Sequence, residues 1–188
     1  METPVRTLQK EVPKATLTRS PSTKGKNPLL SEECAKYLNY RVQQEEQSAR
    51  IYLSMSMWLD NNGYLGAAKL WKKYSDEEMG HANFAREYLL AMGVQPITPK
   101  LDPPNQTFSG LPEIVQMSFD HEIDVTTQCK SLADHAMSIK DHILYQLALK
   151  YLTEQVEEHE KMQNWVDRLT AFGEDNIALR MLDEEMGG

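Results

Sequence analysis

This 188-residue sequence has few cysteines and no long hydrophobic run. Its two cysteines, Cys34 and Cys129, are far apart and form no CxxC pair. Their scarcity excludes a zinc ribbon, a rubredoxin module or a disulfide framework and favours a reducing compartment. No apolar run approaches the roughly 20 residues of a membrane-spanning helix, and the N-terminus has no apolar stretch of signal-peptide type. We therefore expect a soluble, cytoplasmic protein without a membrane partner.

Positive charge is scarce beyond the N-terminal segment. The net charge is −8, but residues 1–28 carry six basic and two acidic side chains, which leaves −12 for the remainder. Residues 1–29 are rich in Ser, Thr and Pro, so we expect a disordered extension before one domain at 30–188. An organelle transit peptide, or an arm that docks on a subunit or a polyanion, is the alternative. The acidic body disfavours nucleic acid as a partner and suits metal cations.

Proline and glycine are missing from long stretches, and their positions divide the domain. Residues 29–95 and 113–188 contain no proline, and residues 111–172 contain no glycine. Such stretches are typical of long helices, which begin at polar caps and end at glycine or a turn. The expected boundaries, in chain order, are Ser31, the turn at 61–63, Gly93, Gly110, a break at 140–141 capped by Asp141, and Gly173, followed by a short fifth helix at 175–186.

Apolar residues four and three apart form one stripe along each of the four long helices, as in Leu38, Val42, Glu45, Ala49 and Tyr52. Helices of nearly thirty residues are about 40 Å long. Short turns make helices one and two, and three and four, antiparallel neighbours, while residues 94–110 can cross the length of the bundle. The sequence therefore predicts an all-α fold, a four-helix bundle with a long crossover and a short C-terminal helix.

Each stripe has an acidic residue in its middle. These acids are Glu45, Glu78, Glu122 and Glu158, and His81 follows Glu78 by one turn. One of them alone could be a hydrogen-bonded core residue, but an unpaired buried ion costs several kcal/mol, and a domain is stable by only about 5–15 kcal/mol. The stripes contain no Lys or Arg, so we expect no basic side chain to compensate the four carboxylates. A pair of metal ions would do so, and oxygen ligands with one imidazole favour divalent iron or manganese.

These residues and their spacing resemble the ferritin family, and closely the bacterial non-haem ferritins, over about residues 30–186. The matching segments are Leu38-Asn39, Glu45, Tyr52, Glu77-Glu78-Met79-Gly80-His81, Glu122 and Thr153-Glu154-Gln155-Val156-Glu157-Glu158. The resemblance implies iron storage and detoxification by a ferroxidase that oxidises Fe(II) with O₂. It also implies a homo-oligomeric cage of 24 subunits that holds ferric mineral, with the fifth helix at its four-fold axis.

The resemblance further implies a di-iron centre with two iron ions per subunit. The first iron would be held by Glu45, Glu78 and His81. Glu78 would also bridge to the second iron, which would be held by Glu122 and Glu158, with Gln155 beside this second ion. Glu77, Glu154 and Glu157 match a third iron site, with solvated surface charges as the alternative. Tyr52 matches the family's tyrosine near the centre, where it would donate a hydrogen bond or an electron, or only pack.

Other members of the superfamily are alternatives. Gln155-x-x-Glu158 replaces the second Glu-x-x-His of bacterioferritin, so haem is not expected, although Met79 sits where that family places its haem ligand. A non-storage di-iron oxidase or a rubrerythrin-like peroxidase is a further alternative. This sequence lacks the rubredoxin cysteines that would support it. A shell subunit without a catalytic centre would not need the full ligand set, and mini-ferritins lack the fifth helix. We expect His121, His135, His142 and His159 at the surface and assign them no role.

Overall fold

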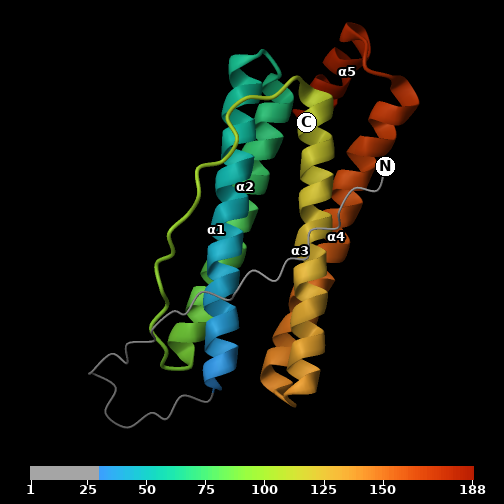
Figure 1. The fold of residues 1–188 in the computed structure, drawn as a ribbon. Helices are drawn as coiled ribbons and strands as arrows, with labels where there is room; N and C mark the ends of the chain where they lie inside the picture. The colour runs from blue at the N-terminus through green and yellow to red at the C-terminus, as the bar shows by residue number, and fades with distance from the viewer. Residues whose placement is uncertain (1–29) are drawn as a thin grey trace, which may run out of the picture.

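The computed structural model describes residues 30–188, which form five α-helices (Figure 1). The helices are α1 (Glu32–Asn61), α2 (Leu65–Ala91), α3 (Leu111–Ser138), α4 (His142–Phe172) and α5 (Asn176–Met186). The predicted extension at 1–29 lies outside the described residues, and its predicted disorder stays a prediction. Among the helices of the described part, none combines the length and the apolar character that a membrane span requires. The predicted all-α fold with a short fifth helix is confirmed.

Side-chain caps mark the starts of α1, α4 and α5. Ser31 Oγ accepts a hydrogen bond from the backbone N–H of Cys34 at 3.0 Å, and Asp141 Oδ1 accepts one from Leu144 at 3.0 Å. Such caps satisfy amide groups that have no partner within the first helical turn. The predicted boundaries at Ser31 and Asp141 are therefore confirmed. Asp175 is the N-cap of α5, so that helix begins one residue later than expected.

The long connector between α2 and α3 runs along α1, as Figure 1 shows. Near one end of α1, Asn39 Oδ1 accepts a hydrogen bond from the Ile97 N–H at 2.7 Å. Near the other end, Ser54 Oγ donates to the carbonyl oxygen of Asn105 at 2.6 Å. Because the connector spans the bundle, α3 starts at the end opposite to the one where α2 stops. The predicted crossover is confirmed.

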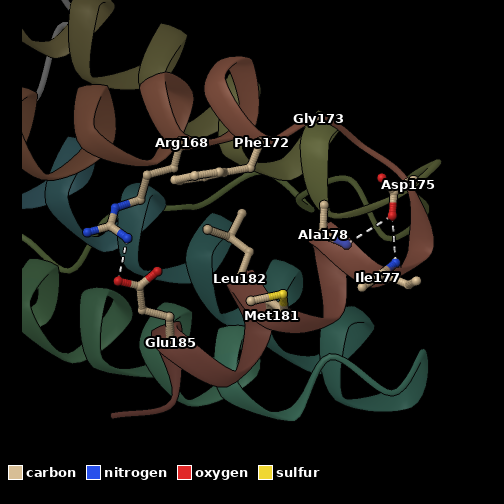
Figure 2. Close-up of a pocket in the computed structure, with 9 residues that line it drawn as sticks. All are labelled: Arg168, Phe172, Gly173, Asp175, Ile177, Ala178, Met181, Leu182 and Glu185. Atoms are coloured by element: carbon tan, nitrogen blue, oxygen red, sulfur yellow. Dashed lines mark hydrogen bonds and ion pairs between the residues drawn. The ribbon is translucent and has the colours of Figure 1, made fainter.

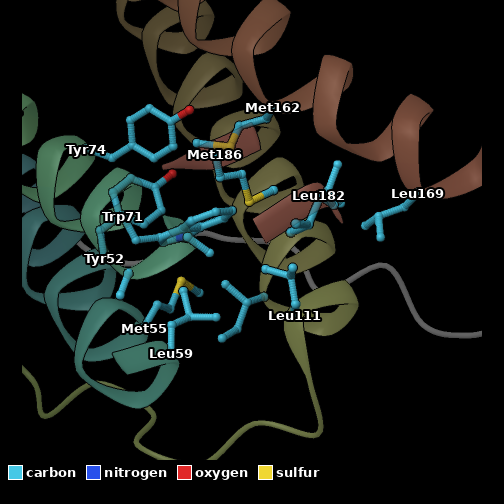
Figure 3. Close-up of a cluster of buried hydrophobic side chains, with 14 of the residues drawn as sticks. Tyr52, Met55, Leu59, Trp71, Tyr74, Leu111, Met162, Leu169, Leu182 and Met186 are labelled. Carbon is cyan, nitrogen blue, oxygen red and sulfur yellow. The ribbon is translucent and has the colours of Figure 1, made fainter. Parts of the chain in front are cut away.

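Two large apolar clusters fill the bundle on either side of its middle, and a small third cluster of Val125, Cys129 and Tyr151 lies between α3 and α4. The cluster nearer α5 takes side chains from all five helices, among them Leu59, Trp71, Leu111, Met162 and Leu182 (Figure 3). The other cluster occupies the opposite end and includes Leu38, Leu89, Ala136 and Leu144. The acidic positions of the four stripes lie between the two clusters in every helix. Apolar packing therefore isolates the middle of the bundle from water along its axis.

Helix α5 packs against the start of α2. The N-cap position Tyr64 provides no side-chain cap, and Asp183 Oδ1 of α5 instead accepts a hydrogen bond from the Ala67 N–H at 2.8 Å. The backbones approach so closely that a β-carbon on Gly66 would lie 1.8 Å from the carbonyl oxygen of Asp183. Only glycine at position 66 allows this contact.

We predict that Gly66→Ala displaces α5 and lowers the free energy of unfolding by about 1–3 kcal/mol, the usual cost of overpacking. Thermal unfolding measured by circular dichroism checks this. Gly80→Ala is the matched control, because Gly80 lies in the same helix with no atom within 4 Å of its added β-carbon. That control should stabilise the protein by about 0.5–1 kcal/mol. Equal effects of the two substitutions would contradict the account of α5 packing.

Candidate metal centre

The four predicted carboxylates are buried near the middle of the bundle. Glu45 comes from α1, Glu78 from α2, Glu122 from α3 and Glu158 from α4, and all four are buried. Because the helices are rigid and each acid sits at mid-stripe, the packing of the helices brings the acids to one level. The predicted arrangement of inward-facing acids is present.

One part of the centre already has metal-ligand spacing. Among residues 30–188, Glu45, Glu78 and His81 form the one set of three possible ligands whose donor atoms all lie within 4.8 Å of one another. His81 Nδ1 lies 3.4 Å from Glu78 Oε2, as their i, i+3 spacing on α2 allows. This hydrogen bond, opposed by burial, raises the pKa of His81 to about 9. The proximity of Glu78 therefore favours the protonated form of His81.

Glu122 is 1% exposed and has one oxygen without a protein partner. Its Oε1 accepts a hydrogen bond from the Tyr52 hydroxyl, while Oε2 is buried and unpaired. A buried carboxylate oxygen without a partner is costly, so an unpaired one points to a missing ligand. Tyr52 thus contributes a hydrogen bond, one of the three roles that its position suggested. Burial, followed by the charge of Glu122, raises the pKa of Tyr52 well above its usual value.

The α4 side of the centre contains Gln155 and Glu158, both buried. Gln155 Oε1 accepts a hydrogen bond from Thr126 Oγ1 at 2.9 Å, so its oxygen is engaged within the protein. Glu158 Oε1 accepts from Lys161 Nζ at 3.0 Å. Gln155 lies beside Glu122, whose pKa it lowers, and Glu158 has the ammonium group of Lys161 as a partner.

Burial makes this cluster of acids electrostatically unfavourable. Desolvation raises the pKa of Glu78 well above its usual range, and it also raises the pKa values of Glu122 and Glu158. The charges of Glu45 and Glu122 add to the rise at Glu78, and the charge of Glu122 adds to that at Glu158. These groups bind protons more tightly than in water, so the site favours any cation that can replace those protons.

The expectation that no basic side chain reaches the cluster is wrong. Arg41 is 3% exposed, and its Nη2 donates to Glu45 Oε1. Its guanidinium also lies 5.0 Å from the centre of the Tyr151 ring, and Nη1 donates to Gln128 Oε1 at 3.4 Å. Arg41 precedes Glu45 by four residues, so its side chain lies beside Glu45 although it is off the main stripe. The i, i+4 spacing of an Arg and an acid was the available signal.

The acids of the expected third iron site are not gathered in the same way. Glu77 pairs with Lys161 at 3.1 Å and with Lys73 at 3.7 Å. Glu154 pairs with Lys150, and Glu157 is exposed. Each of the two partly buried acids therefore has a lysine as partner. A third iron site at Glu77, Glu154 and Glu157 stays a prediction.

His121 was expected at the surface and is instead half-buried on α3, where it faces α1. Its Nε2 lies 2.7 Å from Ser48 Oγ, and its ring meets that of Tyr52 edge-on with 5.7 Å between ring centres. Burial lowers its pKa. His121 packs behind Tyr52 because it directly precedes the inward-facing Glu122, a signal that a search for stripes alone misses. His142 is exposed, as expected.

Comparison with known proteins agrees with this fold. The family model described as a ferritin-like domain matches residues 35–172. The "Probable bacterial non-heme ferritin-like protein" of Haemophilus influenzae and the bacterial non-heme ferritin of Bacteroides fragilis (strain 638R) are each 30% identical over 159 residues. These matches cover 85% of this chain and 96% and 99% of the relatives.

Solved structures show the same fold. An open pore ferritin from the hyperthermophilic archaeon Archaeoglobus fulgidus has a TM-score of 0.80 and 29% sequence identity, covering 84% of this chain and 97% of its own. The chain belongs to the ferritin family. Its similarity to the bacterial non-heme ferritins supports iron as the bound metal and iron storage as the broad function.

We predict that Arg41→Met lowers the free energy of unfolding of the metal-free protein by about 3–5 kcal/mol, because it leaves Glu45 as a buried charge without a partner. Chemical denaturation followed by circular dichroism measures this. The double variant Arg41→Met/Glu45→Gln removes both charges and should recover most of the loss. A double variant as unstable as the single one would show that packing of Arg41, and not its charge, is what matters.

Proposed function

We propose that this protein oxidises Fe(II) with O₂ at the centre inside each bundle and passes the ferric product to a mineral store. The observation that carries the proposal is the buried meeting of four carboxylates with His81, in which three donor groups already lie within 4.8 Å. Such oxygen-rich sites with one imidazole suit divalent iron. Two ions per subunit are proposed, one at the group of Glu45, Glu78 and His81 and one at the unpaired oxygen of Glu122 beside Glu158.

The proposed ligands follow the geometry of the four helices. Glu45, Glu78 and His81 would bind the first Fe(II), and Glu78 would bridge to a second Fe(II) at Glu122 and Glu158. The unpaired Oε2 of Glu122 supports this second position. Gln155 would stay beside the second ion as a hydrogen-bonding neighbour. The two Fe(II) ions would then each give one electron to O₂.

Protein groups would prepare this reaction in three ways. His81 must lose its proton before it can bind a metal, so uptake of Fe(II) at neutral pH should release a proton. Tyr52 would hold Glu122 in place through its hydrogen bond to Oε1. The apolar clusters on both sides would exclude water, which strengthens the attraction between the carboxylates and the substrate ions.

The C-terminal end of the bundle supports a homo-oligomer, and we propose a cage of 24 chains. A pocket of about 690 Å³ lies between the end of α4 and α5 (Figure 2). Among the residues that line it, Phe172, Ile177 and Met181 are 68%, 73% and 66% exposed. Large apolar side chains that remain together in water are typical of contact surfaces between subunits. We expect neighbouring chains to cover this surface.

We predict that Glu78→Ala lowers the rate of Fe(II) oxidation by more than about 100-fold, because the proposed bridge between the two iron positions is lost and even indirect partners of metal ligands change activity 10–100-fold. Stopped-flow absorbance of metal-free protein mixed with Fe(II) and O₂ checks this. Glu87→Ala, an exposed position of the same helix, should leave the rate unchanged. Undiminished oxidation by Glu78→Ala would count against this centre.

We predict that the purified full-length chain sediments as a particle with the mass of 24 copies. Analytical ultracentrifugation measures this mass without reference to iron. The apolar surface around Phe172 and Met181 would then be buried between subunits, as its composition demands. A stable dimer as the largest species would contradict the proposed cage while leaving the iron chemistry untouched.

A further inference from the structure

Lys161 joins the centre to a neighbouring acid. Its ammonium group donates to Glu158 Oε1 at 3.0 Å and to Glu77 Oε2 at 3.1 Å. Glu158 is on α4 and Glu77 on α2, so one lysine links the two antiparallel helix pairs. The ring of Tyr74 lies 5.9 Å from the ammonium nitrogen. A single cation thus compensates two acids, one of which belongs to the proposed second iron position.

The two cations of the centre differ in their freedom to move. Arg41 and its partner Glu45 both have side chains that are 3% exposed, and the guanidinium is also held by Gln128 and Tyr151. The Lys161 side chain is 34% exposed and ends in a flexible four-carbon stem. Lys161 can turn its ammonium into water at small cost, whereas Arg41 would have to cross the packed bundle.

A metal ion at Glu158 would meet the ammonium group at close range. The ammonium nitrogen lies at hydrogen-bonding distance from the oxygen Oε1, so a divalent ion bound there would be strongly repelled by it. The unpaired oxygen of Glu122 on the facing helix still attracts the ion to this place. An ion that binds at Oε1 of Glu158 would displace the ammonium group, and the partly exposed side chain of Lys161 gives that group a path to solvent.

We propose that Lys161 is a positioning residue that acts as a displaceable counter-ion. In the metal-free protein its ammonium holds Glu158 and Glu77 in place, and when Fe(II) binds at Glu158 the ammonium, still protonated, moves into solvent. This inference rests on the proposed function, because it needs Glu158 to be a ligand. It assigns Lys161 a part in the energetics of metal uptake, separate from any contact with the reacting atoms.

This role requires opposite effects in the two states of the protein. Without metal, loss of the Lys161 charge leaves two acids without a partner, so the protein becomes less stable. With metal, the same loss removes a competitor, so the ion binds more tightly. A lysine with a purely structural role would change stability in both states in the same direction and would not change the affinity for metal.

The test compares full-length wild type with Lys161→Met, which keeps the aliphatic stem and removes the charge. Anaerobic calorimetric titration with Fe(II) measures affinity, and anaerobic calorimetric scans with and without Fe(II) measure the unfolding temperature. Lys161→Met should bind the second Fe(II) about fivefold more tightly, the size expected for a partly exposed ion pair. Its unfolding temperature should fall only in the metal-free state.

Two further variants are matched controls. Lys161→Arg keeps the charge and should restore the metal-free unfolding temperature. Lys72→Met removes an exposed lysine whose partner, Asp76, lies outside the centre. This substitution should leave the affinity for the first and for the second Fe(II) unchanged. An unchanged or weaker affinity of Lys161→Met for the second Fe(II), with normal binding by wild type, overturns this inference alone. Absence of Fe(II) binding by wild type would instead refute the proposed function and this inference with it.

Discussion

The burial of four carboxylates in one cross-section of the bundle is the constraint on which the rest of the structure depends. Desolvation raises the pKa values of Glu78, Glu122 and Glu158, and the charges of Glu45 and Glu122 add to the rise. Arg41 and Lys161 offset part of this negative charge, and one oxygen of Glu122 still has no partner. The centre is therefore incompletely neutralised and suited to divalent cations.

The long helices and their end clusters maintain this costly arrangement. Apolar side chains on both sides of the acids supply the free energy of folding, from Leu38 and Leu89 at one end to Trp71 and Met162 at the other. The i, i+3 spacing places Glu78 and His81 on one face without any loop. Because rigid helices supply every candidate ligand, the centre is preorganised before metal arrives.

Much of the fold and the acidic centre could be predicted from the sequence, because helix caps, glycine positions and stripe periodicity are local signals. The cations were missed for a physical reason. Arg41 and Lys161 lie off the apolar stripes, and their long side chains reach the centre from the flanks, which periodicity does not reveal. His121 was missed because its burial depends on packing against Tyr52, a contact between helices. Glu154 pairs with Lys150 four residues earlier, which is a local signal, whereas the pairing of Glu77 with Lys161 joins α2 and α4 and depends on the fold.

The central claim is that these acids are buried together because they bind iron. The most direct test is anomalous diffraction at the iron absorption edge from crystals soaked anaerobically in ferrous salt. The account predicts two peaks per chain, one among Glu45, Glu78 and His81 and one among Glu78, Glu122 and Glu158. Absence of anomalous signal between these side chains, at iron concentrations that saturate the protein in solution, would contradict it.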